Sequence, residues 1–284
     1  MYTLSVENES GERLELSHSL NYTVVNVEGL APPAASVNLT HLGGLHGSRL
    51  NSATIPQRNI VIYVYIENPI EKNRQNLYLY FKSSREVKVF FKNKNRDVYI
   101  EGIVESIECP LFEQRQQMQI SILCPQPYFR AASQFIAEIS KITGLFEFPF
   151  CIEDPMEFSY YDAYKVTEIY NAGDVESGML IELTALGSIV NPCIWNSSTR
   201  EFFSVYDILY TGDVLQINTV SGERYVRKKL SGATEWTNSI ATKTMDSTWL
   251  QIYPGHNSFT YTHEGAEANE AEVTFTGYTL FGGV

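Results

Sequence analysis

The sequence lacks most features that mark membrane, secreted or zinc-binding proteins. No window reaches the ~18 consecutive apolar residues of a membrane-spanning helix, and Met1–Leu4 lacks a basic segment followed by an apolar one. We therefore expect no membrane span and no secretory signal, and a protein that is made and kept in a cytoplasm. Cysteine is scarce and no CxxC pair occurs, which predicts buried thiols rather than disulfides or zinc ligands. The four are Cys109, Cys124, Cys151 and Cys193.

No catalytic or nucleotide-binding motif is complete. The sequence has no Gly-X-Ser-X-Gly nucleophile elbow and no GxxxxGK[ST] phosphate loop. His263–Glu267 differs from the HExxH zinc motif, because its last position is Glu and Gly265 would interrupt the helix. We therefore predict no catalytic residue, no metal and no cofactor. Carboxylate pairs such as Glu153 and Asp154 leave a cell-wall glycosidase as a less favoured alternative.

Positive charge is scarce in the second part of the chain. Residues 1–130 contain 13 Lys+Arg and 13 Asp+Glu, whereas residues 131–284 contain 8 and 20, so the second part carries the whole net charge of −12. A chain of 284 residues is long for one domain. We predict two domains, 1–130 and 131–284, that meet different partners. The acidic surface disfavours nucleic acid and anionic membranes, although it would also serve solubility alone.

What the sequence does contain is a series of strand signals. Runs of β-branched and aromatic residues in the first domain lie at 22–27, 60–66, 87–91, 98–104 and 118–123. Residues 60–66 are apolar on both faces, which predicts a strand covered on both sides by a second sheet or a neighbouring subunit. In the second domain, strands spaced as in an antiparallel sandwich are expected at 179–185, 214–219, 248–253 and 272–278.

One helix interrupts the strands of the first domain. Asn68 is expected as its N-cap, with Pro69 at the first helical position and Glu71 completing a capping box. Ile70, Leu77 and Phe81 then share one face, which should pack on the sheet. A second, shorter helix, ended by Gly144, is an even alternative for the apolar residues between 135 and 142.

Residues 30–57 form an unusual segment with no sustained hydrophobic period. Compact domains rarely contain a loop of this length without a use. Its apolar residues exceed what a solvated loop needs, so we interpret the segment as an arm that docks on a neighbouring subunit, with a disordered surface loop as the alternative. Fully extended, it could reach ~90 Å at ~3.3 Å per residue. The expected interface residues are Val37, Leu39, Leu42, Leu45, Leu50 and Ile55.

Two prolines predict the boundary between the domains. Pro125 and Pro127 each force the preceding residue out of the helical region and cannot donate to a sheet ladder. They also lie close to the change in charge, so we predict an interdomain linker here. In the second domain, Trp195, Trp236 and Trp249 lie in strand-like segments and are expected mainly in the core. Exposed tryptophans would instead favour a carbohydrate-binding β-sandwich module.

Three short motifs in a fixed order resemble the distal tail protein (Dit) family of siphophages. They are Asn95–Gly102 (NRDVYIEG), Cys124–Phe129 (CPQPYF) and Gly173–Gly178 (GDVESG). Each alone is an ordinary turn or strand signal. Their order and spacing, in a chain of this length, carry the resemblance, which spans residues 20–284 and weakens after about residue 190.

The resemblance implies a fold, an assembly and a place in the virion. The fold would be an N-terminal split β-barrel related to tail-tube subunits, with one helix and the long arm, followed by a C-terminal galectin-like β-sandwich. The protein would form a homohexameric ring at the tail tip of a phage or prophage of a Gram-positive host. That ring would join the tail tube to the tail-associated lysin or hub protein and hold receptor-binding or baseplate proteins. Assembly would take place in the host cytoplasm.

Overall fold

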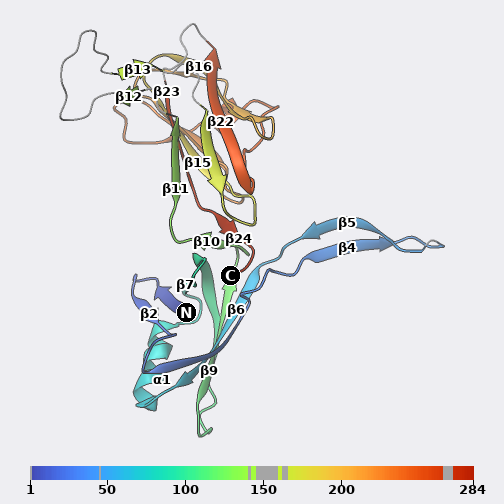
Figure 1. Cartoon of the computed structure of the whole chain (residues 1–284), viewed down its shortest axis with the longest axis vertical. Coiled ribbons are helices and arrows are strands. Elements are labelled where there is room, and N and C mark those ends of the chain that lie inside the picture. The colour runs from blue at the N-terminus through green and yellow to red at the C-terminus, as the bar shows by residue number, and fades with distance from the viewer. Residues whose placement is uncertain (1, 45, 140–141, 145–158, 162–165, 265–270) are drawn as a thin grey trace. The chain divides into compact units, whose positions relative to one another are not determined.

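The computed structural model describes residues 2–44, 46–139, 142–144, 159–161, 166–264 and 271–284 (Figure 1). The chain forms two compact units: Met1–Ala132 with Leu280–Val284, and Ser133–Thr279. Strands dominate both units, which confirms the predicted mainly β fold class. The last five residues return to the first unit, whereas the sequence analysis had assigned them to the second domain. In the described residues, no helix is long and apolar enough to cross a membrane.

The described residues of the first unit form eleven strands and one helix. They are β1 (Thr3–Asn8), β2 (Arg13–Glu15), β3 (Tyr22–Glu28), β4 (Ser36–His41), β5 (Ser48–Thr54), β6 (Arg58–Ile66), α1 (Ile70–Tyr80), β7 (Glu86–Lys92), β8 (Asp97–Glu108), β9 (Gln117–Cys124), β10 (Phe129–Ala131) and β24 (Leu280–Phe281). The main sheet has the order β2-β1-β7-β8-β9-β6-β3, with β10 beside β8 and β24 beside β10. Strands β4 and β5 pair only with each other.

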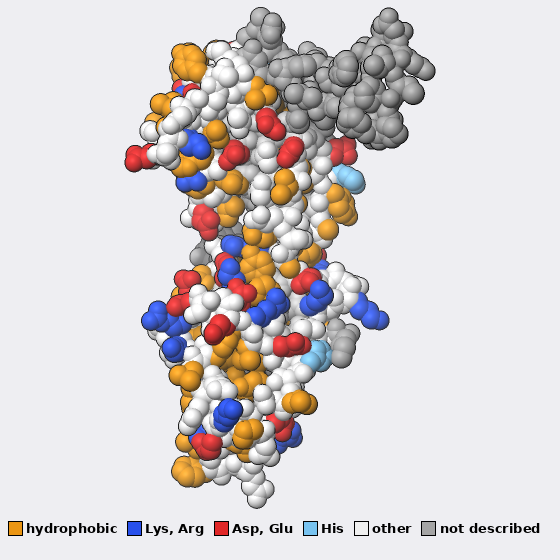
Figure 2. Space-filling model, turned by 90° about the vertical axis from the view of Figure 1, so that its left-hand side faces the viewer, with side chains coloured by type: hydrophobic (Ala, Val, Ile, Leu, Met, Phe, Trp, Pro, Cys, Tyr) orange, Lys and Arg blue, Asp and Glu red, His pale blue; other side chains and the backbone are white. Residues whose placement is uncertain are grey.

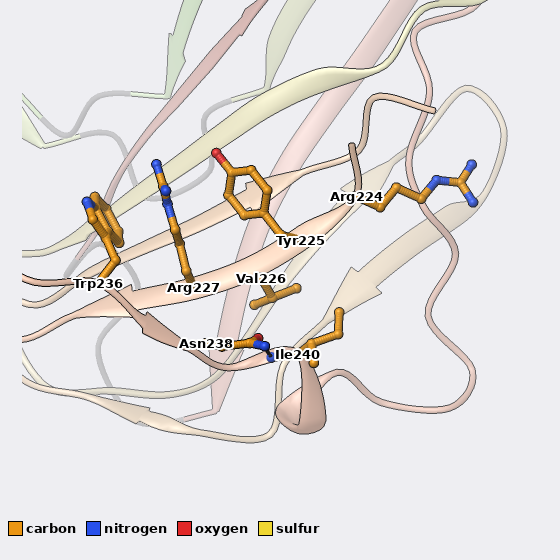
Figure 3. A pocket seen from close by; sticks show the side chains of 7 residues that line it. All are labelled: Arg224, Tyr225, Val226, Arg227, Trp236, Asn238 and Ile240. Carbon is orange, nitrogen blue, oxygen red and sulfur yellow. Dashed lines mark hydrogen bonds between the residues drawn. The ribbon is translucent and has the colours of Figure 1, made fainter. Parts of the chain in front are cut away.

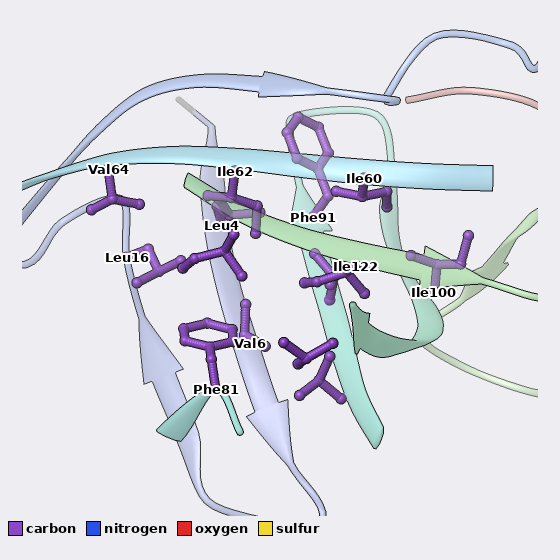
Figure 4. Close-up of a cluster of buried hydrophobic side chains, with 14 of the residues drawn as sticks. Leu4, Val6, Leu16, Ile60, Ile62, Val64, Phe81, Phe91, Ile100 and Ile122 are labelled. Carbon is purple, nitrogen blue, oxygen red and sulfur yellow. The ribbon is translucent and has the colours of Figure 1, made fainter. Parts of the chain in front are cut away.

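The core of the first unit lies on one face of this sheet. Alternate residues of β6, namely Ile60, Ile62 and Val64, are fully buried, and they meet side chains of β1 and β9 (Figure 4). The other face of β6 carries Val61 and Tyr63, which are half-buried. Within the unit, therefore, one face of the strand is covered completely and the other in part. Period-2 alternation explains this division, because successive side chains of a strand point to opposite faces.

The helix covers the core with the predicted face. Leu77 and Phe81 are fully buried, and Ile70 packs against the same cluster. The predicted N-cap was wrong, because the helix begins at Ile70 after Pro69 and no side chain caps it. Instead the buried Asn73 donates from Nδ2 to the Glu67 carbonyl at 2.9 Å, which fixes the chain entering the helix from within its first turn.

The second unit is built from two large antiparallel sheets and the two-stranded pair of β12 with β13. One has the order β11-β23-β15-β19-β20-β21 and the other β14-β22-β16-β17, with β18 beside β16. The ring centres of Phe259 in β22 and Phe275 in β23 lie 5.1 Å apart, within one buried cluster that both sheets share. The bounds are β11 (Phe135–Ile139), β12 (Ile142–Gly144), β13 (Ser159–Tyr161), β14 (Thr167–Asn171), β15 (Met179–Ala185), β16 (Ile189–Asn196), β17 (Glu201–Ser204), β18 (Ile208–Leu209), β19 (Val214–Asn218), β20 (Tyr225–Lys229), β21 (Thr237–Asn238), the 3₁₀ turn η1 (Ile240–Thr242), β22 (Gly255–Glu264) and β23 (Ala271–Gly277).

Two sequence expectations for this unit were wrong. The helix considered for residues 135–144 is replaced by β11, which pairs with β23 from Phe135 to Ile139, and by β12. The apolar residues of β11 fit a strand equally well, since Phe135 and Ile139 face the core and Ile136 is exposed. Residues 248–253 form no strand, although Leu250 and Ile252 are fully buried. A buried irregular segment also needs apolar residues, so the composition of residues 248–253 resembles that of a strand.

The two prolines lie inside the first unit. Pro125 and Pro127 occupy the turn between β9 and β10, and β10 then pairs with β8 and β24. The chain therefore continues the first sheet after the prolines, and the division between the units falls after Ala132. The prediction of a linker at these residues was wrong, because their restricted geometry serves a tight turn within a domain as well as a boundary.

Candidate functional site: an exposed hairpin and its anchor

The predicted arm is a two-stranded β-hairpin that projects from the body of the first unit (Figure 1). On β4, Val37 and Leu39 alternate with polar residues, and the register places them opposite Ala53 and Leu50 of β5. Directly paired residues of an antiparallel pair point to the same face. Over these two pairs one face of the hairpin is therefore apolar, whereas the next pair on that face, His41 with Ser48 near the tip, is polar.

The opposite face of the hairpin is polar. Asn51 lies at a β-bulge, where the register shifts between Asn38 and Leu39. Its Nδ2 atom donates to Thr40 Oγ1 at 2.6 Å and approaches Asn38 Oδ1 at 3.4 Å. These contacts lie on the face away from Leu39 and Leu50. The bulge thus keeps apolar side chains together although Leu50 and Ala53 are three positions apart in the sequence.

The apolar side chains of the hairpin are open to solvent. The exposed fractions are 52% for Val37, 55% for Leu39 and 59% for Leu50. Leu42 and Ile55, at the two ends of the hairpin, are also exposed, and Leu45 lies outside the described residues. Whether these residues contact another subunit stays a prediction. The expected reach of ~90 Å was too long, because the segment turns back on itself and halves the extended length.

A buried arginine anchors the root of the hairpin. Arg58 begins β6 and is 4% exposed. It donates to the carbonyls of Gly29 at 2.7 Å, Ala31 at 3.2 Å and Gly282 at 2.5 Å. Its guanidinium also lies 4.6 Å from the centre of the Phe129 ring. Burial lowers the pKa of Arg58, since the charged form loses water.

Arg58 thereby joins three stretches of chain that are far apart in sequence. They are Gly29 to Ala31, which lead into the hairpin, Arg58 itself at the start of β6, and the C-terminal end at Gly282. The backbone N–H of Val284 donates to the Leu30 carbonyl at 3.1 Å, which closes the same junction. The base of the hairpin is therefore fixed by part-buried hydrogen bonds of the buried Arg58, while its strands pair only with each other.

Two of the three motifs that carry the family resemblance meet at this junction. From the first motif, Arg96 donates to the Gly283 carbonyl, and its guanidinium lies 4.6 Å from the Phe281 ring centre. From the second motif, Phe129 is buried and pairs with Phe281 across β10 and β24. The motifs thus hold the C-terminal strand in the first unit, a role that sequence spacing alone did not reveal.

The third motif forms a turn inside the second unit. Asn171 Nδ2 donates to the carbonyls of Val175 and Ile252, both at 3.1 Å, and Asn171 Oδ1 accepts from the Gly173 N–H at 2.9 Å. At Gly178, an added Cβ would lie 2.5 Å from the Val220 Cα. Backbone cannot yield to such a contact, so this position requires glycine. The motif serves packing rather than phosphate binding.

The described residues offer little for catalysis or metal binding. No group of three or more His, Cys, Asp or Glu residues within them could hold a metal ion. Cys109, Cys124 and Cys193 are free thiols, of which Cys124 is buried as predicted and the other two are half-buried. Cys151 lies outside the described residues. Burial raises the pKa of Cys124 to about 12 and that of Cys193 to about 11. Both remain protonated at neutral pH, and the thiol is a poor nucleophile.

The carboxylates and tryptophans considered from the sequence are dispersed. Glu153 and Asp154 lie outside the described residues. Trp249 packs against the core of the second unit, as expected. Trp195 is 38% exposed and contacts Phe202, with ring centres 4.7 Å apart, so its core placement was wrong. Trp236 lines a surface hollow on β20 and β21.

Comparison with known proteins identifies the second unit. Residues 172–278 match the family model described as the siphovirus-type tail component, C-terminal domain. This stretch is therefore similar to the C-terminal domain of siphovirus-type tail components. The resemblance to distal tail proteins that the three motifs suggested is thereby confirmed. No curated protein matches the chain.

Solved structures extend the similarity to the whole fold. The crystal structure of phage SPP1 Dit, described as a paradigm of hub adsorption apparatus in Gram-positive infecting phages, is 12% identical. The similarity covers 98% of this chain and 99% of that one, with a TM-score of 0.65. A chain of the phage P2 baseplate in its activated conformation is 8% identical, with coverage of 97% and 98% and a TM-score of 0.50. Together with the family match, this fold supports a structural role in a phage tail tip or baseplate.

Proposed function

We propose that six copies of this chain form a closed ring at the tail tip, and that each hairpin docks on the neighbouring first unit. The observation that carries the proposal is the apolar face of β4 and β5, exposed on a hairpin whose root is fixed by Arg58. A two-stranded hairpin is marginally stable alone in water. A contiguous exposed apolar face indicates an interaction site.

A ring explains why the hairpin can project without a partner in its own chain. A heterologous contact repeated around an axis closes into a ring, so each subunit gives one hairpin and receives another. The half-buried outer face of β6, with Val61 and Tyr63, is a surface in the first unit that a neighbouring subunit could cover. This would also complete the two-sided burial that its sequence predicts.

The ring would connect other tail proteins. The first units would continue the tail tube on one side and receive the tail-associated lysin or hub protein on the other. The second units would hold receptor-binding or baseplate proteins, and the particle would assemble in the host cytoplasm. The difference in charge between the two parts of the chain supports separate partners, and on the face seen in Figure 2 Lys and Arg side chains lie mainly over the first unit.

Sedimentation velocity on a triple variant tests the ring. Val37, Leu39 and Leu50 are replaced by Ser, which removes the apolar face but leaves the polar one. Each side chain is about half exposed in the single chain, so each substitution should remove about 1 to 2 kcal/mol of burial at every contact. We expect the variant to sediment as a monomer with an unchanged circular dichroism spectrum.

The matched control changes the other face of the same hairpin. Asn38, Thr40 and Thr54 are replaced by Ser, which keeps hydrogen-bonding groups at the three positions. This variant should still form the ring. If the apolar-face variant sediments as the wild-type ring, the hairpin is a surface loop and the ring needs another interface.

We further propose that the protein has no catalytic activity. The protonated thiols and the absence of a possible metal cluster among the described residues favour a structural role. Incubation with peptidoglycan should give no turnover. Hydrolysis that disappears when one acidic residue is changed would favour the glycosidase alternative. A monomer that binds neutral glycans would favour the carbohydrate-binding alternative.

A further inference from the structure

The second unit contains a cluster of basic residues, although it has few basic residues in total. Residues 131–284 have only 8 Lys+Arg, yet four of them lie between 224 and 229. Lys228 is neutralised, because its Nζ lies 3.2 Å from Asp207 Oδ2 and 3.7 Å from Asp213 Oδ2. Arg227 and Lys229 point to the other face of β20, since side chains alternate along a strand. The uncompensated charge therefore gathers on one face.

On that face, Arg227 is held between two aromatic rings. The centre of its guanidinium lies 4.6 Å from the Tyr225 ring and 4.5 Å from the Trp236 ring. Figure 3 shows the three side chains in one row, with the guanidinium between the rings. Lys229 Nζ lies 5.1 Å from the same Trp236 ring. Stacking covers both flat faces of the guanidinium, so only its N–H edges can meet a ligand.

One of these edges is already fixed. Arg227 Nε donates to Gln216 Oε1 at 2.7 Å, and Tyr225 donates its hydroxyl to the same oxygen at 3.1 Å. Gln216 in turn donates from Nε2 to Glu182 Oε2 at 2.9 Å, which orients its amide. Within the described residues, no carboxylate forms an ion pair with Arg227. Its two terminal nitrogens, Nη1 and Nη2, remain as a fork whose direction is fixed by the hydrogen bond at Nε and by the two rings.

A pre-oriented guanidinium fork matches one kind of group. Arginine binds carboxylate and phosphate through two parallel hydrogen bonds, and stacking reduces the entropy lost on binding. The adjoining hollow has a volume of about 390 Å³ and is lined by Arg227, Tyr225, Trp236 and Asn238, among others. Volumes of ~300–1,000 Å³ are typical of sites for small molecules. The rings offer apolar contact beside the cation, and Asn238 and Tyr225 offer polar groups for hydroxyls.

We propose that this hollow binds an acidic sugar, whose phosphate or carboxylate is held by Arg227 and whose ring lies against Trp236 and Tyr225. Lys229 adds long-range attraction. The site lies wholly within the second unit, so it does not depend on the ring or on the hairpin.

Calorimetric titration of the full chain with small sugars tests the site. Glucose 6-phosphate and glucuronate carry the two acidic groups, and glucose serves as the neutral reference. A charge-assisted pair of hydrogen bonds should make the acidic sugars bind at least ~10-fold more tightly than glucose. The tighter of the two acidic sugars identifies phosphate or carboxylate as the preferred group. Higher salt should weaken both.

Variants of one residue decide whether the fork is responsible. Arg227→Gln should abolish binding, and Arg227→Lys should weaken it at least ~10-fold, because lysine keeps the charge but cannot form the planar fork. Arg200→Gln, an equal charge change at an exposed turn of the same unit, should bind as wild type. Unchanged melting of the Arg227→Lys variant confirms that it folds. Full binding by that variant would overturn the proposal.

Two further ligands test the class of molecule. Inorganic phosphate that binds as tightly as glucose 6-phosphate would show that the sugar ring contributes nothing. An acidic peptide that binds more tightly than both acidic sugars, and only with Arg227 present, would assign the site to a protein partner. Either result overturns the acidic sugar, as does the absence of binding by all of these ligands.

Discussion

Residues 36–54 and residues 58–66 are neighbours in the chain and both form antiparallel strands, yet their surroundings differ. Every residue of β4 and β5 is exposed, whereas Ile60, Ile62 and Val64 of β6 are fully buried. In β4 apolar and polar residues alternate, and in β6 buried and half-buried residues alternate from Ile60 to Ile66. The difference is that β6 lies between β9 and β3 in a sheet with a covered face, and β4 has only β5.

The comparison shows that strand pairing and burial are separate events. Hydrogen bonds between β4 and β5 satisfy the backbone of the hairpin without covering any side chain. Burial requires a second layer, which α1 and β1 provide for β6. The exposed strands of the hairpin end at its root, and the buried residues of β6 begin there with Arg58.

The largest expected difference comes from truncating one apolar side chain to alanine in each segment. Ile62→Ala should lower the free energy of unfolding by about 2 to 5 kcal/mol, because it leaves a cavity in a packed core. Leu39→Ala should change it by less than about 0.5 kcal/mol in the monomer. Urea unfolding, followed by circular dichroism at concentrations where light scattering reports monomers, measures both. Equal losses would mean that the hairpin packs on its own unit.

The second test removes the anchor between the two segments. Arg58→Met should cost about 2 to 4 kcal/mol, since three part-buried carbonyls lose a charged donor. Hydrogen exchange should accelerate at the Val284 amide, which bonds to Leu30 in the same junction. Arg115→Ala removes an exposed ion pair with Glu67 at 3.3 Å and should cost less than about 1 kcal/mol. An unaffected Val284 amide would show that the C-terminal end is held without Arg58.

The third test uses pH to probe the buried side of the junction. Burial raises the pKa of Cys124, which pairs with Arg58, from 9.0 to about 12. When pH rises, the unfolded chain therefore loses this proton first. The stabilisation is complete below about pH 9 and is lost between pH 9 and 12. From pH 8 to 10.5 the free energy of unfolding should fall by about 2 kcal/mol from this group alone.

Cys124→Ala provides the control for this pH dependence. The variant should be less stable at pH 8, since it loses a buried side chain, but its stability should fall less steeply with pH. An identical slope in wild type and variant would show that Cys124 ionises alike in the folded and unfolded chain. Urea unfolding at several pH values gives both slopes.

The smallest expected effect concerns the bulge in the hairpin. Asn51→Ala removes the hydrogen bond to Thr40 and should cost about 0.5 to 1 kcal/mol of local stability. Hydrogen exchange should accelerate in β4 and β5 and stay unchanged in β6. Acceleration that spreads into β6 would show that the hairpin and the body unfold as one unit.

Parts of the fold were predictable because local patterns and tertiary structure agree. The helix face of Ile70, Leu77 and Phe81 followed from its hydrophobic period, and five strands of the first unit followed from runs of β-branched and aromatic residues. These strands are β3, β6, β7, β8 and β9. The hairpin did not, because the bulge at Asn51 interrupts the alternation of β5. Strand β11 was ambiguous, since apolar residues at 135, 136 and 139 suit a helix until β23 is known to lie beside them.

The candidate sites depended still more on tertiary structure. The hairpin residues named from the sequence are exposed wherever the structure describes them, and their role as an interface stays a prediction. The Arg58 junction was not predicted, because its partners Gly29, Ala31 and Gly282 contribute only carbonyls, which every residue has. Arg227 was not singled out either, since its ring contacts need Trp236, which precedes the next strand β21.

The sequence by itself determined the mainly β fold, the helix face and the resemblance to distal tail proteins, because these depend on residue type at short spacing. Tertiary structure decided where the chain divides, because β24 returns to the first unit and pairs with β10. The paired residues, Phe129 with Phe281 and Arg130 with Leu280, are 150 or more positions apart in the sequence. It also decided which apolar residues stay exposed. Whether a side chain meets water depends on the layer that covers it, and residues close in sequence do not specify that layer.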